Sequence, residues 1–283
     1  MNERIVLITG ASSGVGRDAA ESIAARGYTV YAASRNTSAA YGERIRPLKM
    51  DVTSPDSIRS ALDVVDSEFP GCGLYALIHN AGTVVPGPLE CLDENLFSRH
   101  FQVNVMGVHS LTRAALRMLR KGNGRIIMIG SINGRIAKPY IGAYSASKFA
   151  LRAMADAWRM ELEQWNIHVS MIEPGSIKTP LWGKARIEMQ GLIETLDDAG
   201  RENYLSSIET VMKAAEKREG RGLPAARVVK SVIRALESDR PKASYLIGAS
   251  AVIQTCLASV LPRSLLNRLI ISQFGFSGKR DDS

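Results

Sequence analysis

Cysteine and histidine are scarce in this chain, and neither residue type has the spacing of a metal site. Among 283 residues there are 3 cysteines and 4 histidines, and no two histidines form a His-x3-His pair. An odd number of cysteines without ligand spacing is typical of small buried residues in a reducing compartment. We therefore expect neither a disulfide-stapled secreted fold nor a bound metal ion.

Clusters of positive charge are also missing, although the formal net charge is +8. Nucleic-acid-binding surfaces gather their basic residues and interleave them with aromatics. The scattered charges here predict no nucleic-acid partner, but they would suit a phosphate-rich cofactor or an anionic membrane face. The N-terminal residues lack the layout of a secretory signal, so we expect a cytoplasmic protein.

The feature around which the chain is organised is a tyrosine and a lysine, Tyr144 and Lys148, four residues apart. On a helix this spacing puts both side chains on one face. A free phenol has a pKa of about 10, and a nearby ammonium group favours the phenolate. Ser131 could set a hydroxyl donor beside the phenol, so that both would hold one carbonyl or alcohol oxygen. Alone, a Tyr-x3-Lys pair is more often part of an amphipathic helix with a solvated lysine.

A glycine-rich turn follows the first predicted strand, 4–9, and precedes a predicted helix. Glycines there let the backbone approach a phosphate, and the helix N-terminus offers free N–H groups. The turn contains Gly10, Ser12, Ser13, Gly14, Val15 and Gly16. Its Gly-x3-Gly-x-Gly spacing differs from the Gly-x-Gly-x-x-Gly of many dinucleotide enzymes. The alternative interpretation is a tight turn that needs small residues.

The second predicted strand, 29–33, does not end in an acidic residue. An NAD-binding fold usually places an acid there to bind the ribose hydroxyls. The position instead holds Arg35, which would pair with a 2′-phosphate. We therefore expect NADP(H) in preference to NAD(H), and the alternative is a surface arginine at a strand end.

Asp51 and Val52 follow the third predicted strand, and small residues follow the fourth. The Asp51 carboxylate would accept a hydrogen bond from adenine or cap the helix predicted at 55–68. The residues after the fourth strand would let the backbone run under a flat ring: Asn80, Ala81 and Gly82. Asn104 lies inside a long predicted helix, 93–119, where it would kink the helix, hold a water or be satisfied within the core.

Strands predicted at 125–131, 168–172 and 245–248 complete a set of seven that alternates with helices. The alternation predicts a single-domain α/β fold of the Rossmann type over 1–248, with a doubly wound parallel sheet and helices on both faces. Ligands of such sheets bind beyond the carboxyl ends of the strands. Most of the candidate residues follow a strand and would meet at that edge.

Together these stretches resemble the short-chain dehydrogenase/reductase family over roughly residues 4 to 180. The resemblance rests on the order and spacing of Thr9 to Gly16, Asp51, Asn80-Ala81-Gly82, Asn104, Ser131, Tyr144, Lys148 and Pro174-Gly175. Two positions depart from the family. Ile132 stands where a second serine is common. Tyr245 to Ser250 lacks the Asp-Gly-Gly of many acyl-carrier-protein ketoreductases, which argues against that activity.

The resemblance implies a role for each matched position. Tyr144 would be the general acid/base, and Lys148 would lower its pKa and bond the nicotinamide ribose. Ser131 would orient the reacting oxygen, and Asn104 would hold a water in a proton relay through Lys148. The cofactor would lie against Gly10, Ser12, Ser13, Gly14, Val15, Gly16, Arg35, Asp51, Val52, Asn80, Ala81, Gly82, Tyr144, Lys148, Pro174, Gly175, Ile177 and Thr179.

The C-terminal third is apolar in two places. Apolar residues recur at roughly helical spacing within 181–223, which we interpret as a lid over a lipophilic substrate. Packing of this face on the core is an equal alternative. The tail, 249–276, mixes apolar residues with two arginines and is similar to tails of the retinol and hydroxysteroid dehydrogenase branch. It would close the pocket, join subunits or contact a membrane surface peripherally, and 277–283 would be disordered.

We therefore expect an NADP(H)-dependent oxidoreductase. It would move a hydride between the nicotinamide and the carbonyl or alcohol carbon of a steroid-, retinoid- or lipid-like molecule, as a homodimer or homotetramer. One alternative is a reductase of 3-oxoacyl thioesters. Another is a non-catalytic NADP-binding regulator or membrane-associated scaffold, which the presence of Ser131, Tyr144 and Lys148 disfavours.

Overall fold

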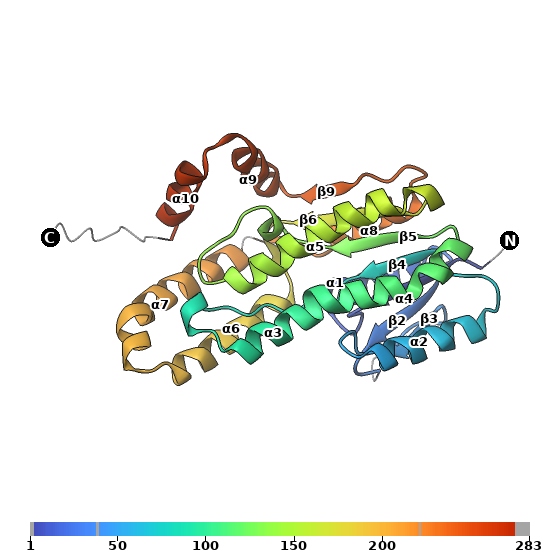
Figure 1. Ribbon diagram of the computed structural model, residues 1–283, viewed down its shortest axis with the longest axis horizontal. Helices are drawn as coiled ribbons and strands as arrows, with labels where there is room; N and C mark the ends of the chain where they lie inside the picture. The colour runs from blue at the N-terminus through green and yellow to red at the C-terminus, as the bar shows by residue number, and fades with distance from the viewer. Residues whose placement is uncertain (1–2, 38–39, 221, 275–283) are drawn as a thin grey trace.

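Seven parallel strands form the central sheet of this computed structural model, as the alternation of strands and helices predicts (Figure 1). The structure describes residues 3–37, 40–220 and 222–274. The strand order is β3-β2-β1-β4-β5-β6-β9, so the direction of winding reverses between β1 and β4. The strands are β1 (Ile5–Thr9), β2 (Thr29–Ser34), β3 (Ile45–Lys49), β4 (Ala76–His79), β5 (Arg125–Ile129), β6 (His168–Pro174) and β9 (Ser244–Ile247).

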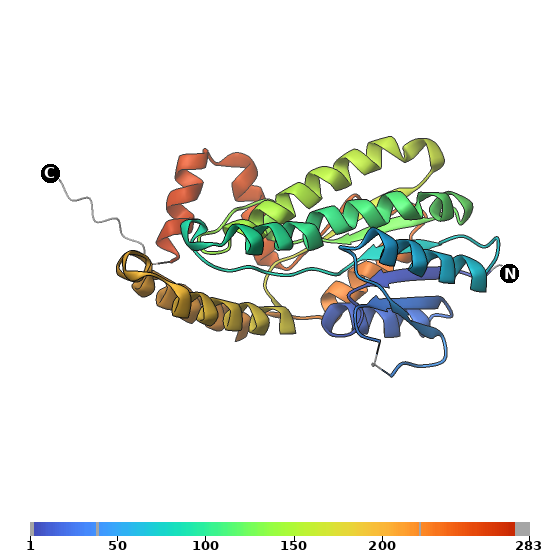
Figure 2. The ribbon, with the colours of Figure 1, turned by 60° about the horizontal axis from the view of Figure 1, so that its bottom comes forward.

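Helices cover both faces of this sheet, and each face packs into its own apolar core. In Figure 2 the green and yellow-green helices α4 and α5 lie above the sheet and the blue α1 lies below it. One layer consists of α2 (Pro55–Glu68), α4 (Gly107–Lys121) and α5 (Gly142–Glu161), and the other of α1 (Gly14–Ala24) and α8 (Ala226–Glu237). All of β1 is buried because a strand between two helical layers exposes neither face.

The helix predicted over 93–119 is interrupted. It consists of α3 (Glu94–Phe101), a π-helical turn η2 (Gln102–Met106) and α4. Single π-turns inside α-helices often mark functional sites. Asn104 lies in this turn, which agrees with the kink expected there.

The predicted lid consists of α6 (Pro180–Thr195) and α7 (Asp198–Gly220), which lie together beyond the carboxyl ends of the strands (Figures 1 and 2). A short strand pair that the sequence did not predict joins the base of this segment. β7 (Ile177–Lys178) precedes α6 and pairs with β8 (Leu223–Pro224), which follows α7. The segment therefore leaves the domain and returns to it at the same place.

The C-terminal tail forms two helices, α9 (Ala249–Val260) and α10 (Arg263–Ser272), beyond edge strand β9. Both helices expose large apolar side chains, including Ile253 at 59% and Val260 at 80%. No helix within 3–37, 40–220 and 222–274 is long and apolar enough to cross a membrane. The disorder expected for 277–283 falls outside the described residues. Three short 3-10 segments complete the elements: η1 (Leu89–Cys91), η3 (Ile132–Gly134) and η4 (Glu163–Trp165).

Candidate active site

The turn after β1 leaves no room for a side chain at Gly10 or Gly16, because Asn80 is bonded across it. The Asn80 Nδ2 donates to the carbonyl oxygens of Thr9 at 3.0 Å and Gly10 at 2.9 Å. A Cβ at Gly16 would lie 2.3 Å from Asn80 Nδ2 and 2.3 Å from the Gly10 oxygen. Gly10 and Gly14 also have positive φ angles of 65° and 55°. Asn80 therefore fixes the shape of the turn, a role beyond the flat-ring contact expected for it.

The start of α1 has the donor set that a phosphate group needs. Ser13 is the N-cap of α1, and its side chain makes no capping hydrogen bond, so the first backbone N–H groups keep no side-chain partner there. Ser12 and Ser13 are exposed, whereas Gly14 and Val15 are half-buried. A helix N-terminus of this kind favours anions through its N–H groups and its dipole. The turn therefore has donors that suit the phosphates of a dinucleotide, and their contact with a cofactor stays a prediction.

Arg35 is exposed beyond the end of β2, and it lies beside Asp51. The pKa of Asp51 is lowered chiefly by hydrogen bonds from Thr53 and also by the charge of Arg35. The Asp51 Oδ1 accepts from the Thr53 backbone N at 2.9 Å and from its Oγ1 at 2.7 Å. The predicted capping alternative for Asp51 is wrong, because Ser54 caps α2 by accepting from the Ser57 backbone N.

Tyr144 and Ser131 are buried together beyond the carboxyl end of β5, and each side chain is 5% exposed. Tyr144 lies in the first turn of α5, and Ser131 caps η3 by accepting from the Asn133 backbone N at 3.1 Å. Burial raises the pKa of Tyr144 to about 12, and its hydrogen bond with the Ser131 hydroxyl opposes that rise. The phenol is consequently protonated at neutral pH.

Lys148 lies one turn further along α5, but its ammonium group is not directed at the phenol oxygen. Its Nζ donates to the Ile129 carbonyl oxygen at 2.9 Å and lies 5.6 Å from the centroid of the Tyr144 ring. Burial lowers the pKa of Lys148 to about 8. The expectation that this ammonium group brings the Tyr144 pKa down is not met here, because desolvation of the phenol outweighs other influences.

Asn104 has its side chain satisfied within the core, which was one of the expected alternatives. Its Oδ1 accepts from the Thr83 backbone N at 2.9 Å, and its Nδ2 donates to the Thr83 oxygen at 3.0 Å and to Ser147 Oγ at 3.1 Å. Both polar atoms of the side chain therefore already have partners, and the expected contact with a water stays a prediction. Gly82 lies between Asn104 and Lys148. A Cβ added at Gly82 would lie 3.3 Å from Asn104 Oδ1 and 3.9 Å from Lys148 Nζ.

His100 also belongs to this network, and the sequence did not single it out. Its Nδ1 bonds Thr83 Oγ1 at 2.9 Å, and its Nε2 bonds Ser147 Oγ at 3.1 Å. Burial, followed by the charge of Lys148, lowers the pKa of His100 to about 4. The ring lies 6.3 Å from that of Tyr144. A neutral histidine therefore supports α5, the helix of Tyr144, by bonding Ser147. A lone histidine in a helical pattern gives no sequence signal of this role.

The residues after β6 connect the sheet to the predicted lid. The Gly175 backbone N donates to the Ile247 oxygen at 3.1 Å, so the segment stays paired to β9 beyond Pro174. Ile177 is 4% exposed in the core, and Thr179 is the N-cap of α6 without a side-chain capping bond. Their expected contact with a nicotinamide would therefore use main-chain atoms of Ile177 and the free hydroxyl of Thr179. Val52 and Ala81 pack closely against glycines. A Cβ added at Gly107 would lie 2.8 Å from the Val52 carbonyl oxygen, and one added at Gly10 would lie 2.8 Å from the Ala81 Cα.

Tyr144 belongs to a small apolar cluster whose other members come from several elements. They are Val84, Ile141, Leu181, Trp182 and Ala185. The Trp182 ring lies 6.1 Å from the Tyr144 ring and meets it edge-on at 72°. The packing alternative for the predicted lid holds in part, since Trp182 packs against Tyr144 and Met189 packs in an apolar cluster with α7, whereas Ile187 is 68% exposed. That the segment covers a substrate stays a prediction.

Comparison with known proteins agrees with this arrangement. The family model described as short chain dehydrogenase matches residues 4–190. The chain is 37% identical to 3-amino-tetrahydro-pyrrolizinone reductase of Xenorhabdus hominickii, over 76% of each protein. It is 29% identical to estradiol 17-beta-dehydrogenase 2 of Mus musculus, over 97% of this chain and 76% of that protein.

A solved structure shares the whole fold. The short chain dehydrogenase from Burkholderia cenocepacia J2315 in complex with NADP superposes with a TM-score of 0.73 at 24% identity, over 95% of this chain and 98% of that one. The family match covers well over half of the chain and includes Tyr144 and Lys148. The chain belongs to the short-chain dehydrogenase/reductase family and is an NAD(P)-dependent oxidoreductase.

Proposed function

We propose that this enzyme uses NADP(H) to reduce a carbonyl group, or oxidise the matching alcohol, on a lipophilic small molecule. The observation that carries the proposal is the apolar wall around a buried, protonated phenol. A pocket with one polar group in an apolar wall selects apolar substrates and fixes their orientation through that group. The steroid in the printed name of the mouse relative is of this class.

The cofactor supplies or accepts the hydride, and the chain's part is to hold the reacting oxygen and to move its proton. The Ser131 and Tyr144 hydroxyl groups lie within hydrogen-bond distance of each other, so both would be close enough to bind one carbonyl oxygen. Because the phenol is protonated at neutral pH, it can donate its proton to the developing alkoxide. Lys148 would hold positive charge nearby and bond a ribose hydroxyl of the cofactor. A water relay at Asn104 would share the side-chain atoms that already bond Thr83 and Ser147.

The preference for NADP(H) rests on Arg35. This arginine is exposed just beyond the end of β2, near Asp51. The sequence has no acidic residue in the ribose-binding position. A 2′-phosphate there would receive charge-assisted hydrogen bonds, each contributing about 1.5–3 kcal/mol. NAD(H) has no group that could use them.

The test is turnover of a panel of steroid and long-chain ketones with NADPH and with NADH. We expect wild type to reduce apolar ketones and to favour NADPH. Arg35→Ala should lower kcat/KM for NADPH at least about tenfold and leave the value with NADH nearly unchanged. Arg26→Ala is the matched control, because Arg26 is an equally exposed arginine at the far end of α1, where it pairs with Glu237. Equal use of both cofactors by wild type would contradict the assignment of Arg35.

We further propose that the tail contacts an anionic membrane surface peripherally. From Ser244 through Phe274 there is no acidic residue, while Arg263 and Arg268 lie among exposed apolar side chains. Apolar residues flanked by arginines suit the boundary between headgroups and acyl chains. The first turn of α9 lies against Gly175, so the tail starts beside the active site.

Vesicle co-sedimentation tests this proposal. We expect the full chain to sediment with vesicles containing phosphatidylserine and much less with phosphatidylcholine alone. Ile253→Ser with Val260→Ser should reduce binding severalfold, whereas Ile187→Ser, at 68% exposure on the lid, should not. Light scattering on the same samples reports oligomeric state. If the tail substitutions instead dissociate a dimer or tetramer, the exposed face is a subunit interface and the membrane proposal is wrong.

A further inference from the structure

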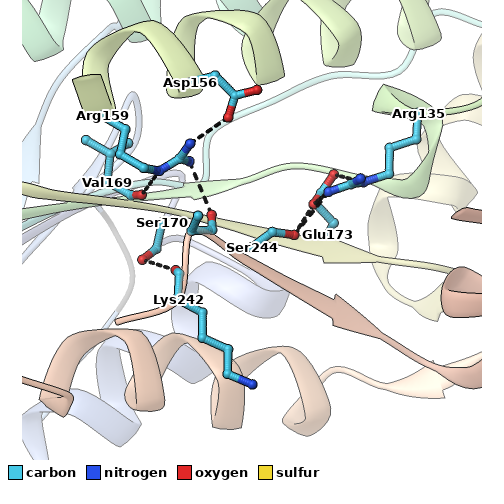
Figure 3. Close-up of polar contacts among 9 residues, drawn as sticks. Arg135, Asp156, Arg159, Val169, Ser170, Glu173, Lys242 and Ser244 are labelled. Carbon is cyan, nitrogen blue, oxygen red and sulfur yellow. Dashed lines mark hydrogen bonds and ion pairs between the residues drawn. The ribbon is translucent and has the colours of Figure 1, made fainter. Parts of the chain in front are cut away.

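A buried ion pair joins the loop that carries Ser131 to the strand that ends at Pro174. Arg135 Nε donates to Glu173 Oε1 at 2.7 Å, and Arg135 Nη2 donates to Glu173 Oε2 at 2.6 Å (Figure 3). Arg135 Nη2 also bonds Ser244 Oγ at 3.2 Å, and that hydroxyl donates to Glu173. The Glu173 side chain is 1% exposed and that of Arg135 17%. The Glu173 carboxylate thereby joins β6 to the loop of Arg135 and to β9, which carries Ser244.

The loop between Ser131 and Arg135 is also packed closely against α5. A Cβ at Gly134 would lie 2.7 Å from the Lys148 carbonyl oxygen, so the loop rests directly on α5. A Cβ at Gly130, just before the serine, would lie 2.4 Å from Met171 Cε and 3.5 Å from Glu173 Cγ. The catalytic serine is therefore held between the helix of Tyr144 and the strand of Glu173.

Stability alone is a poor reason for such a pair. Removing two charges from water costs about as much as their attraction returns, so a buried ion pair adds little net stability over apolar residues. What a bidentate guanidinium–carboxylate contact does provide is a fixed distance and a fixed orientation. Orientation matters here because donors to a reacting oxygen lose much of their effect when misplaced by about 1 Å.

We propose that Arg135, Glu173 and Ser244 form a positioning clamp that sets the Ser131 hydroxyl against Tyr144 and the reacting oxygen. The clamp rests on the proposed function, since it acts through Ser131. None of its three side chains touches the reacting atoms. Its effect should therefore be seen in the chemical step and not in cofactor affinity.

The test is Arg135→Lys, which keeps the charge but cannot make the two parallel bonds. We expect kcat for ketone reduction to fall at least about tenfold, with the Kd for NADPH within about twofold of wild type. Arg159→Lys is the matched control. Arg159 also ties α5 and the segment before β9 to β6, through Asp156, the Val169 oxygen and the Ala243 oxygen, but away from Ser131 (Figure 3). It should lower thermal stability to a similar extent and leave kcat near wild type.

The pH profile separates positioning from loosened packing. The Ser131 hydrogen bond opposes the rise in the Tyr144 pKa, so a displaced serine should leave less phenolate at each alkaline pH. This displacement of the profile is measured as a lower rate of alcohol oxidation at a fixed alkaline pH. The titratable side chains near the phenol are Lys148 and His100, and the substitution touches neither. Arg159→Lys should show no such displacement.

Two further variants keep the proposal open to contradiction if Arg135→Lys folds poorly. Ser244→Ala removes only one arm of the clamp and should lower kcat severalfold. Glu173→Gln combined with Arg135→Lys should lose no more activity than either change alone, since both act through one contact. Wild-type kcat and pH profile in folded Arg135→Lys or Ser244→Ala would overturn the clamp. Inactive wild type with every ketone and cofactor would instead contradict the proposed function.

Discussion

Replacing Tyr144 by phenylalanine should lower kcat for ketone reduction at least about a hundredfold, because the chain loses its proton donor. The ring itself should stay in place, since it packs against Val84, Trp182 and Ala185. Binding of NADPH, measured by quenching of protein fluorescence, should change less than about threefold. The large loss in kcat with an intact binding site is the signature of a catalytic group.

Tyr75→Phe provides the comparison for that substitution. The Tyr75 hydroxyl donates to the Leu236 oxygen at 3.2 Å, at the amino end of β4 and so at the opposite end of the sheet from Tyr144. Its removal should cost about 1 kcal/mol of stability, as for a typical hydrogen bond, and leave kcat unchanged. If Tyr144→Phe kept a tenth or more of wild-type kcat, another group would be the proton donor, and the assignment of Tyr144 would be wrong.

Gly16→Ala should have the largest effect on cofactor binding. Its Cβ would lie 2.3 Å from both Asn80 Nδ2 and the Gly10 oxygen, and the oxygen belongs to the backbone. Relief of that overlap requires the turn after β1 to shift, with a loss of about 1–3 kcal/mol in unfolding free energy. The same shift moves the α1 N-terminus, so the Kd for NADPH should rise at least about tenfold. Chemical denaturation and cofactor titration measure the two effects.

Gly191→Ala is the control for this prediction, because Gly191 lies within α6 and a Cβ there meets nothing within 4 Å. It should stabilise the protein by about 0.5–1 kcal/mol, as alanine does at a tolerant helical position. Cofactor affinity should remain as in wild type. A Gly16→Ala variant with wild-type affinity would mean that the turn does not hold the cofactor.

The sequence predicted those parts of the fold that local patterns determine. All seven strands lie within a few residues of their predicted positions. The clearest is β1, because a strand buried on both faces must be apolar throughout. The helix Pro55–Glu68 has the predicted bounds, since Ser54 and Pro55 form a recognisable start. The spacing of Tyr144 and Lys148 placed both on one helix, as the structure shows.

Features that depend on distant segments could not be predicted. The bond from Asn80 to Gly10 spans 70 positions, and the pair of Arg135 with Glu173 spans 38. The sequence does not show which residues will pair over such distances. An arginine that will pair with a distant glutamate looks like any other arginine until the fold brings the two together. The pKa of Tyr144 is a further example. The sequence gives the lysine nearby but not the burial, and burial has the greater influence.

Three of the apolar residues that cluster with Tyr144 are separated in the chain from the groups that we propose perform the chemistry. Leu181, Trp182 and Ala185 all come from the first two turns of α6. Ser131 lies in the loop after β5, and Tyr144 and Lys148 lie on α5, which packs on the core of the sheet. Substitutions in this one stretch of α6 can therefore change which molecules fit without disturbing proton transfer. Such a division makes substrate range easy to alter during divergence while the reaction itself is inherited unchanged.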